Sequence, residues 1–251
     1  MFLELFFWNL TARFRRLPLF FGCIAILGYL LAASLSQHSA TDSGPMTATV
    51  LVLGRVRSFT FVLILIEVMG FRTLYGNGSI HMFLRSGSRG RYWLSRVLAT
   101  FTVSGAFALL LILVVYIMNL LIKRVVPHSV VAAVHGSPAI PYGALALVFL
   151  LLTVGIAVIL VLIDVWQVIL SHAFLAYVLV IAVQIVSLTS NALFSGATGR
   201  FFFLLSPFLR LSLIDNGIYG EQPIHSAGYL AMLLILESLV GWLVLRRKDI
   251  Q

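Results

Sequence analysis

Long apolar runs are the feature that most restricts how this chain can fold. Residues 142–163 contain no charged side chain, and further runs of similar length are spread along the sequence. A helix needs about 20 such residues to cross the roughly 30 Å hydrocarbon core of a bilayer. Hydrophobic residues make up 61% of the chain and charged residues 10%, whereas a soluble domain usually carries about a quarter charged residues. The sequence therefore predicts an all-α integral membrane protein.

Six transmembrane helices in a single domain of residues 1–251 follow from these runs. The spans are predicted at about 17–36, 47–75, 93–122, 142–163, 168–190 and 226–245. Arg55, Arg57 and Glu67 interrupt the second run. At about 42 Å, a helix over the whole run would be longer than the hydrocarbon core. It either emerges on both sides of the membrane or begins only near Ser58.

Two connections between the spans have unusual composition. Residues 164–167 are predicted to form a tight turn between the fourth and fifth spans, with Asp164 exposed to solvent. The link at 201–213 is too apolar for an ordinary loop and contains Pro207. Such a segment is expected to dip into the membrane as a broken helix, which requires cover from the protein or from a cavity.

The first 16 residues predict an amphipathic helix that lies in the membrane interface. Aromatic and leucine side chains recur at helical spacing between Phe2 and Phe14, with polar residues off that stripe. The alternative is a signal peptide. Its apolar core would be the run at 17–35, which is longer than the roughly 7–15 residues expected of a signal core. A retained first span is therefore favoured.

The distribution of cationic residues predicts the orientation. If both termini are cytoplasmic, the inner segments carry eleven of the seventeen Lys and Arg residues and the outer segments carry six. Positive charge is retained on the cytoplasmic side, so this orientation is preferred. The formal charge of +9 comes from short loops beside the spans, which does not indicate a nucleic-acid-binding surface.

The most basic window, residues 76–96, lies between the second and third spans. Ser79 is placed to cap a short helix that ends at Arg85, where the helix dipole favours a cation. Such a helix can dock a soluble partner, and the alternative is a merely solvated basic loop. Aromatic and basic residues after it are predicted to anchor the third span at the membrane interface. These anchors are Arg89, Arg91, Tyr92, Trp93 and Arg96.

Motifs of catalysis and metal binding are missing from the sequence. The chain has no phosphate-binding loop, and neither of its lysines, Lys123 and Lys248, follows a glycine. There is no H-E-x-x-H pattern, and the single cysteine, Cys23, has no partner at a useful spacing. We therefore expect no catalytic residue, no metal and no cofactor bound by this chain.

Two acids, Glu67 and Glu237, fall within predicted spans. A charge near the bilayer centre costs several kcal/mol, so a functional role is the default interpretation of such residues. An ion pair or a buried hydrogen bond between helices is the favoured explanation here, and a role in a substrate path is the alternative.

One short motif resembles a known family. It begins with Phe83-Leu84-Arg85-Ser86-Gly87-Ser88-Arg89 and continues with Tyr92-Trp93-Leu94-Ser95-Arg96. This run is similar to the signature that opens the third helix of type-2 ATP-binding-cassette (ABC) permeases of bacterial peptide and antibiotic exporters. Tyr92 at the first aromatic position and Arg96 at the lysine position depart mildly from that signature.

The resemblance implies a permease subunit of the bacterial cytoplasmic membrane. It would pair with a second permease chain, the same or homologous, and with two copies of a soluble ATPase that binds ATP and Mg²⁺. The amino-terminal helix would be the family's elbow helix. Glu67 and Gln184 are implied as substrate-path residues, and 201–213 as part of an outer gate. The helix seated in the ATPase, called the coupling helix, would consist of Ser79, Ile80, His81, Met82, Phe83, Leu84 and Arg85.

The expected function is export of a hydrophobic or amphipathic substrate, such as a peptide antibiotic, drug or lipid. The separate ATPase would drive alternating access. A non-transporting six-helix sensor or immunity subunit remains an alternative, and an intramembrane enzyme is a weaker one.

Overall fold

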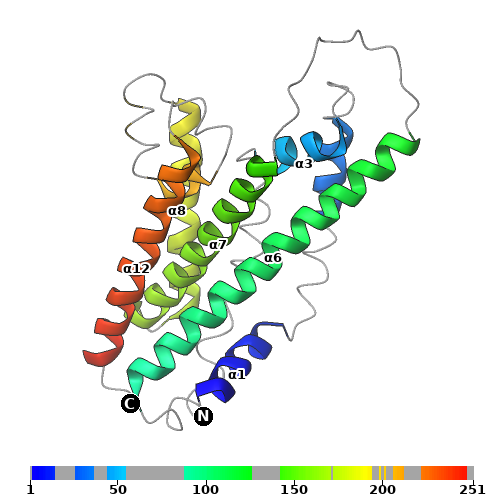
Figure 1. Cartoon of the computed structure of the whole chain (residues 1–251). Coiled ribbons are helices and arrows are strands. Elements are labelled where there is room, and N and C mark those ends of the chain that lie inside the picture. The colour runs from blue at the N-terminus through cyan, green and yellow to red at the C-terminus, as the bar shows by residue number, and fades with distance from the viewer. Residues whose placement is uncertain are drawn as a thin grey trace.

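All the elements that the structure describes are helices (Figure 1). The computed structural model describes residues 2–14, 26–36, 44–54, 88–125, 142–170, 172–193, 198, 201, 206–211 and 222–247. The helices are α1 (Phe2–Phe14), α3 (Pro45–Leu53), α6 (Arg89–Val125), α7 (Tyr142–Leu170), α8 (Ala173–Leu193), α10 (Pro207–Arg210) and α12 (Pro223–Arg247). A further apolar helix covers Ile26–Ser36.

Three of these helices are long and apolar enough to cross a membrane. Their apolar parts are Arg89–Lys123, Gly143–Leu170 and Pro223–Arg247. They match the predicted third, fourth and sixth spans, which is consistent with a helical membrane protein. α6 has 37 residues and is therefore about 55 Å long, which is more than a bilayer core requires. The count of six spans stays a prediction.

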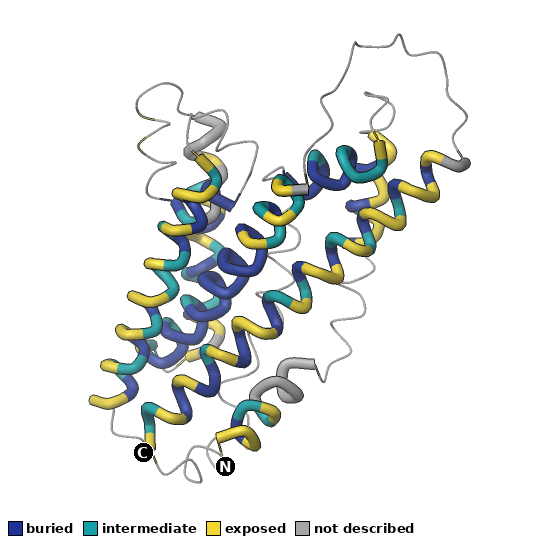
Figure 2. Tube along the Cα trace, in the orientation of Figure 1, coloured by how far each residue is buried: buried dark blue, intermediate teal, exposed yellow. Residues whose placement is uncertain are grey.

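α7 is the central helix of the bundle. In its most apolar stretch 72% of the residues are buried, against 28% for α6 and 22% for α12. Figure 2 shows the middle of α7 as almost wholly buried, while α6 and α12 alternate between buried and exposed turns. α12, α6 and α8 all pack against α7. The larger core cluster accordingly contains a nearly continuous series of α7 residues from Val148 to Ile163.

The predicted turn at 164–167 is wrong, because α7 continues without a break to Leu170. Asp164 is not solvated either, since it is only 2% exposed. Its charge is matched by Arg96 of α6, and its neighbours Val165 and Val168 are buried in a core cluster. With its charge compensated inside the protein, Asp164 does not require the helix to end.

Part of the link at 201–213 enters the protein interior. Ser206 caps α10 by accepting a hydrogen bond from the backbone N–H of Leu209. Leu211 packs directly on Gly155, where a Cβ atom would overlap its side chain. Gly155 lies 13 and 15 residues from the ends of α7, or roughly 20 Å from each. This part of the link therefore reaches the middle of α7, as a segment that dips into the bundle would.

Candidate functional site at the start of α6

Four helices meet where α6 begins, and residues of the basic motif contact the other three. We call this region the α6 junction, defined by residues 88–96 and the residues that they contact. Its core is formed by Leu5 of α1, Tyr92 and Trp93 of α6, Val161, Val165 and Val168 of α7, and Leu245 of α12. The junction thus joins the amino-terminal helix to the long helices.

Ser88 caps the first turn of α6, and Arg89 in the same turn caps the end of α12. The Ser88 hydroxyl accepts a hydrogen bond from the backbone N–H of Arg91 at 3.2 Å. A serine at this position satisfies an amide that has no partner inside the helix. Arg89 donates from Nη1 to the backbone carbonyls of Leu245, at 3.2 Å, and Arg246, at 2.8 Å. A cation at these last carbonyls is also favoured by the dipole of α12.

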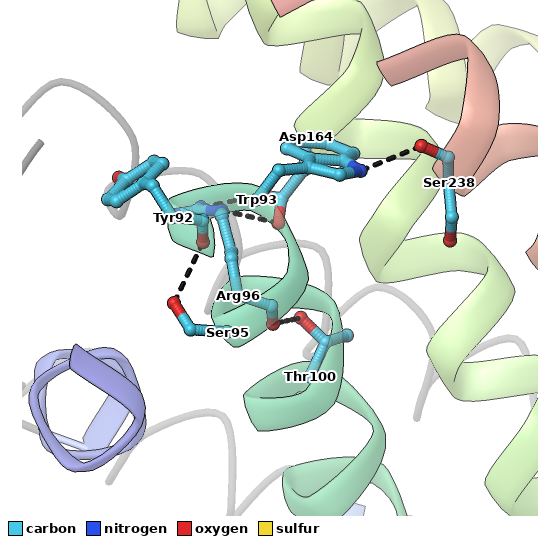
Figure 3. A network of polar contacts seen from close by, with 7 residues as sticks. All are labelled: Tyr92, Trp93, Ser95, Arg96, Thr100, Asp164 and Ser238. Atoms are coloured by element: carbon cyan, nitrogen blue, oxygen red, sulfur yellow. Dashed lines mark hydrogen bonds and ion pairs between the residues drawn. The ribbon is translucent and has the colours of Figure 1, made fainter. Parts of the chain in front are cut away.

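Trp93 fixes the distance between α6 and α12. Its indole Nε1 donates to the backbone carbonyl of Ser238 at 2.7 Å (Figure 3). The ring lies against Gly241, where any Cβ atom would overlap it. Gly241 is therefore required for close approach of the two helices rather than for backbone flexibility.

A buried ion pair joins α6 to α7. Arg96 Nε donates to Asp164 Oδ2 at 2.7 Å, and Arg96 Nη2 donates to Asp164 Oδ1 at 2.8 Å (Figure 3). Both side chains are 2% exposed. This bidentate geometry is the strongest form of an arginine–carboxylate contact, and it fixes orientation as well as distance. Because removal of one partner leaves an uncompensated buried charge, the pair makes the relative position of α6 and α7 specific.

The predicted interface anchors divide into two groups. Tyr92, Trp93 and Arg96 are buried by other helices of the chain, so their main contacts are within the protein. Arg91 is exposed, and Arg89 is half-buried while it caps α12. The position of these residues relative to a membrane surface stays a prediction.

The other predicted site residues are placed only in part. The seven coupling residues from Ser79 to Arg85, and also Glu67, lie outside the described residues. Gln184 of α8 is 2% exposed, and neither polar atom of its amide has a hydrogen-bond partner in the described part of the chain. The structure therefore places Gln184 inside the bundle and does not test its role in a substrate path.

Glu237 was expected to join helices through an ion pair or a hydrogen bond. It is buried on α12, but its Oε2 has no hydrogen-bond partner among the described residues. The buried acid that does join two helices is Asp164. A sequence signal for it existed, because Arg96 and Asp164 are opposite charges that both lie at the edges of apolar runs.

No group of three or more metal-ligating side chains occurs among the described residues. Searches of family models, characterised proteins and solved structures found no significant match to this chain. The polar groups of the α6 junction hold helices together, since Arg89 and Trp93 donate to carbonyls of α12 and Arg96 donates to Asp164 of α7.

Proposed function

We propose that this chain is the membrane subunit of an ABC transporter, in which a separate ATPase drives movement of the helix bundle. The substrate class that we propose is hydrophobic or amphipathic: a peptide antibiotic, a drug or a lipid. The chain would act with a second permease chain, identical or homologous, and with two ATPase copies. ATP and Mg²⁺ would bind to those ATPase copies.

The observation that carries this proposal is the direct connection of the basic motif to three other helices. Ser88, Arg89, Trp93 and Arg96 all belong to the motif that resembles the permease signature. Ser88 caps α6 itself, Arg89 and Trp93 contact α12, and Arg96 contacts α7. Tyr92 and Trp93 share a core cluster with Leu5 of α1. A displacement applied just before residue 88 would therefore act on all four helices together.

In the proposed mechanism, these contacts transmit movement of the coupling residues to the other helices. Closure of the ATPase copies would move the coupling residues Ser79–Arg85, which lie just before the α6 junction in the sequence. The bidentate ion pair would transmit the movement to α7, and Trp93 and Arg89 would transmit it to α12. α1 would tilt with α6 because Leu5 is packed into the same cluster. Interdigitated cores move between discrete arrangements rather than deforming gradually, which suits alternating access.

Association with the ATPase tests the proposal. The tagged chain would be purified from membranes of its source organism, and co-purifying proteins would be identified by mass spectrometry. We expect an ATPase with a phosphate-binding loop to accompany the natural chain. Combined Phe83→Asp and Arg85→Glu substitutions should remove it, while Gly228→Ala, at an uncrowded position of α12, should not.

The outcomes separate the candidate functions. If no such ATPase accompanies the natural chain, the proposal is wrong. If the ATPase is retained, ATP-dependent uptake of peptide antibiotics, apolar drugs and labelled lipid into inverted vesicles should be measured. An associated ATPase with no movement of any of these compounds would favour the sensor or immunity role.

A further inference from the structure

Glu237 is a buried acid that the α6 junction does not use. It lies 10 residues before the end of α12 and 14 residues after its start, about 15 Å and 21 Å from the two ends. The residue is 9% exposed and belongs to the buried face of α12, with Leu230, Gly241 and Leu245. Glu237 is therefore near the middle of a helix that is long enough to span a membrane.

The surroundings of Glu237 are apolar on the side of α7. Leu230 packs in the larger core cluster, and Leu245 packs with Val161 and Val165 of α7. Glu237 lies between these two contacts on the same face. The corresponding part of α7, residues 154–163, has no polar side chain at all. This stretch of α7 offers the carboxyl group neither a hydrogen-bond donor nor a cation.

The buried arginines of the helices that pack near this face already have other partners. α12 packs against α7, α6 and α10. Arg96 of α6 is held by Asp164 of α7 through two hydrogen bonds. Arg210 of α10 lies over the ring of Tyr229, with its guanidinium carbon 4.2 Å from the ring centroid.

Tyr229, eight residues before Glu237 on α12, lies close enough to interact electrostatically with the acid, but it is a neutral phenol and supplies no positive charge. Tyr92, the remaining buried titratable side chain of α6, packs in the second core cluster with Leu5. The Oε2 atom of Glu237 has no hydrogen-bond partner among the described residues. Among the described residues, an ionised carboxylate in this position would be a buried charge without compensation, which is more costly than a neutral buried polar group.

We propose that Glu237 is a proton-binding site on the buried face of α12. In the packed bundle, Oε2 would carry a proton taken from a hydronium ion, which leaves a water molecule and a neutral carboxylic acid. Exposure of this face would allow the proton to return to water. Of the two buried acids described on α7 and α12, Asp164 is paired with Arg96. The second acid is neutralised by a proton instead.

Infrared difference spectroscopy tests the protonation state directly. The full chain in lipid vesicles at neutral pH would be compared with the Glu237→Gln variant, which has almost the same shape. We expect the natural chain to show the carbonyl stretch of a protonated carboxylic acid, and the variant to lack it. If the substitution instead removes only the bands of an ionised carboxylate, the proposal is overturned.

The pH dependence of unfolding gives a second test that requires no ATPase, so its result is independent of the transport proposal. Below about pH 4 the two chains should unfold at the same detergent concentration, because the carboxyl group is then protonated in the folded and the unfolded chain alike. As the pH rises above this value, the unfolded natural chain ionises, so the natural chain alone should lose up to about tenfold in its folded-to-unfolded ratio per pH unit until the folded carboxyl group ionises too. Equal pH profiles, or a greater loss in the variant, would refute proton binding.

Discussion

Replacement of Asp164 by asparagine should be one of the most destabilising conservative changes in this protein. The amide has the same shape as the carboxylate, so packing around α7 is preserved. Asparagine keeps one acceptor but turns a donor toward the guanidinium of Arg96. The charge of Arg96, which is 2% exposed, is then left without its counter-ion.

The expected cost follows from this geometry. Breaking a fully buried ion pair by removal of one partner costs about 3–5 kcal/mol, because the remaining charge stays desolvated. Removal of both charges in the double variant Arg96→Met and Asp164→Asn should recover much of this loss, since no buried charge remains. We therefore expect a coupling free energy of at least about 2 kcal/mol between the two positions.

Reversible unfolding in mixed detergent micelles, followed by circular dichroism, measures these free energies. The single variants, the double variant and the natural chain form a complete thermodynamic cycle. Arg91→Gln is the matched control, because Arg91 is an exposed arginine of the same helix and its loss should change stability by less than about 0.5 kcal/mol. A cost below about 1 kcal/mol for Asp164→Asn, or additive single effects, would refute a buried, coupled pair.

Three further changes test other contacts of the α6 junction, by unfolding, amide exchange and proteolysis. Gly241→Ala should cost about 1–3 kcal/mol because its methyl group overlaps an indole ring, whereas Gly228→Ala, with nothing within 4 Å, should be neutral or slightly stabilising. Equal effects of the two glycine changes would contradict the close approach. Arg89→Gln should cost about 1–2 kcal/mol and speed amide exchange in the last turn of α12; unchanged exchange there would exclude its capping role. Leu5→Ala should release α1 and expose it to protease, while Leu3→Ala, at an exposed position, should not, and equal protection of both variants would show that Leu5 does not hold α1.

The helical class and the long spans were accessible from the sequence because they depend on local properties. Runs of apolar residues restrict the backbone to helices whose polar groups are satisfied internally. The long apolar helices α6, α7 and α12 confirm this part of the prediction. α6 begins at Arg89, four residues before the start predicted for the third span.

The helical pattern of α1 was also visible, but not its contact with the bundle. Its aromatic stripe predicted an amphipathic helix, and Phe2 and Phe7 are indeed exposed. Leu5, which is off that stripe, is the residue buried against α6. In a chain this apolar, hydrophobic side chains occur on both faces of the helix. The pattern alone does not tell which face meets protein and which meets lipid.

By itself, therefore, the sequence determined that this chain folds into long apolar helices and that basic residues lie at the start of one of them. Only the tertiary structure decided that α7 is the central helix and that Asp164 is a buried partner of Arg96, 68 residues away. Taken alone, an ionised acid at the end of an apolar run has its lowest free energy in water, so the sequence favoured a solvated turn. The fold reverses that preference, because a bidentate arginine compensates the charge inside the bundle.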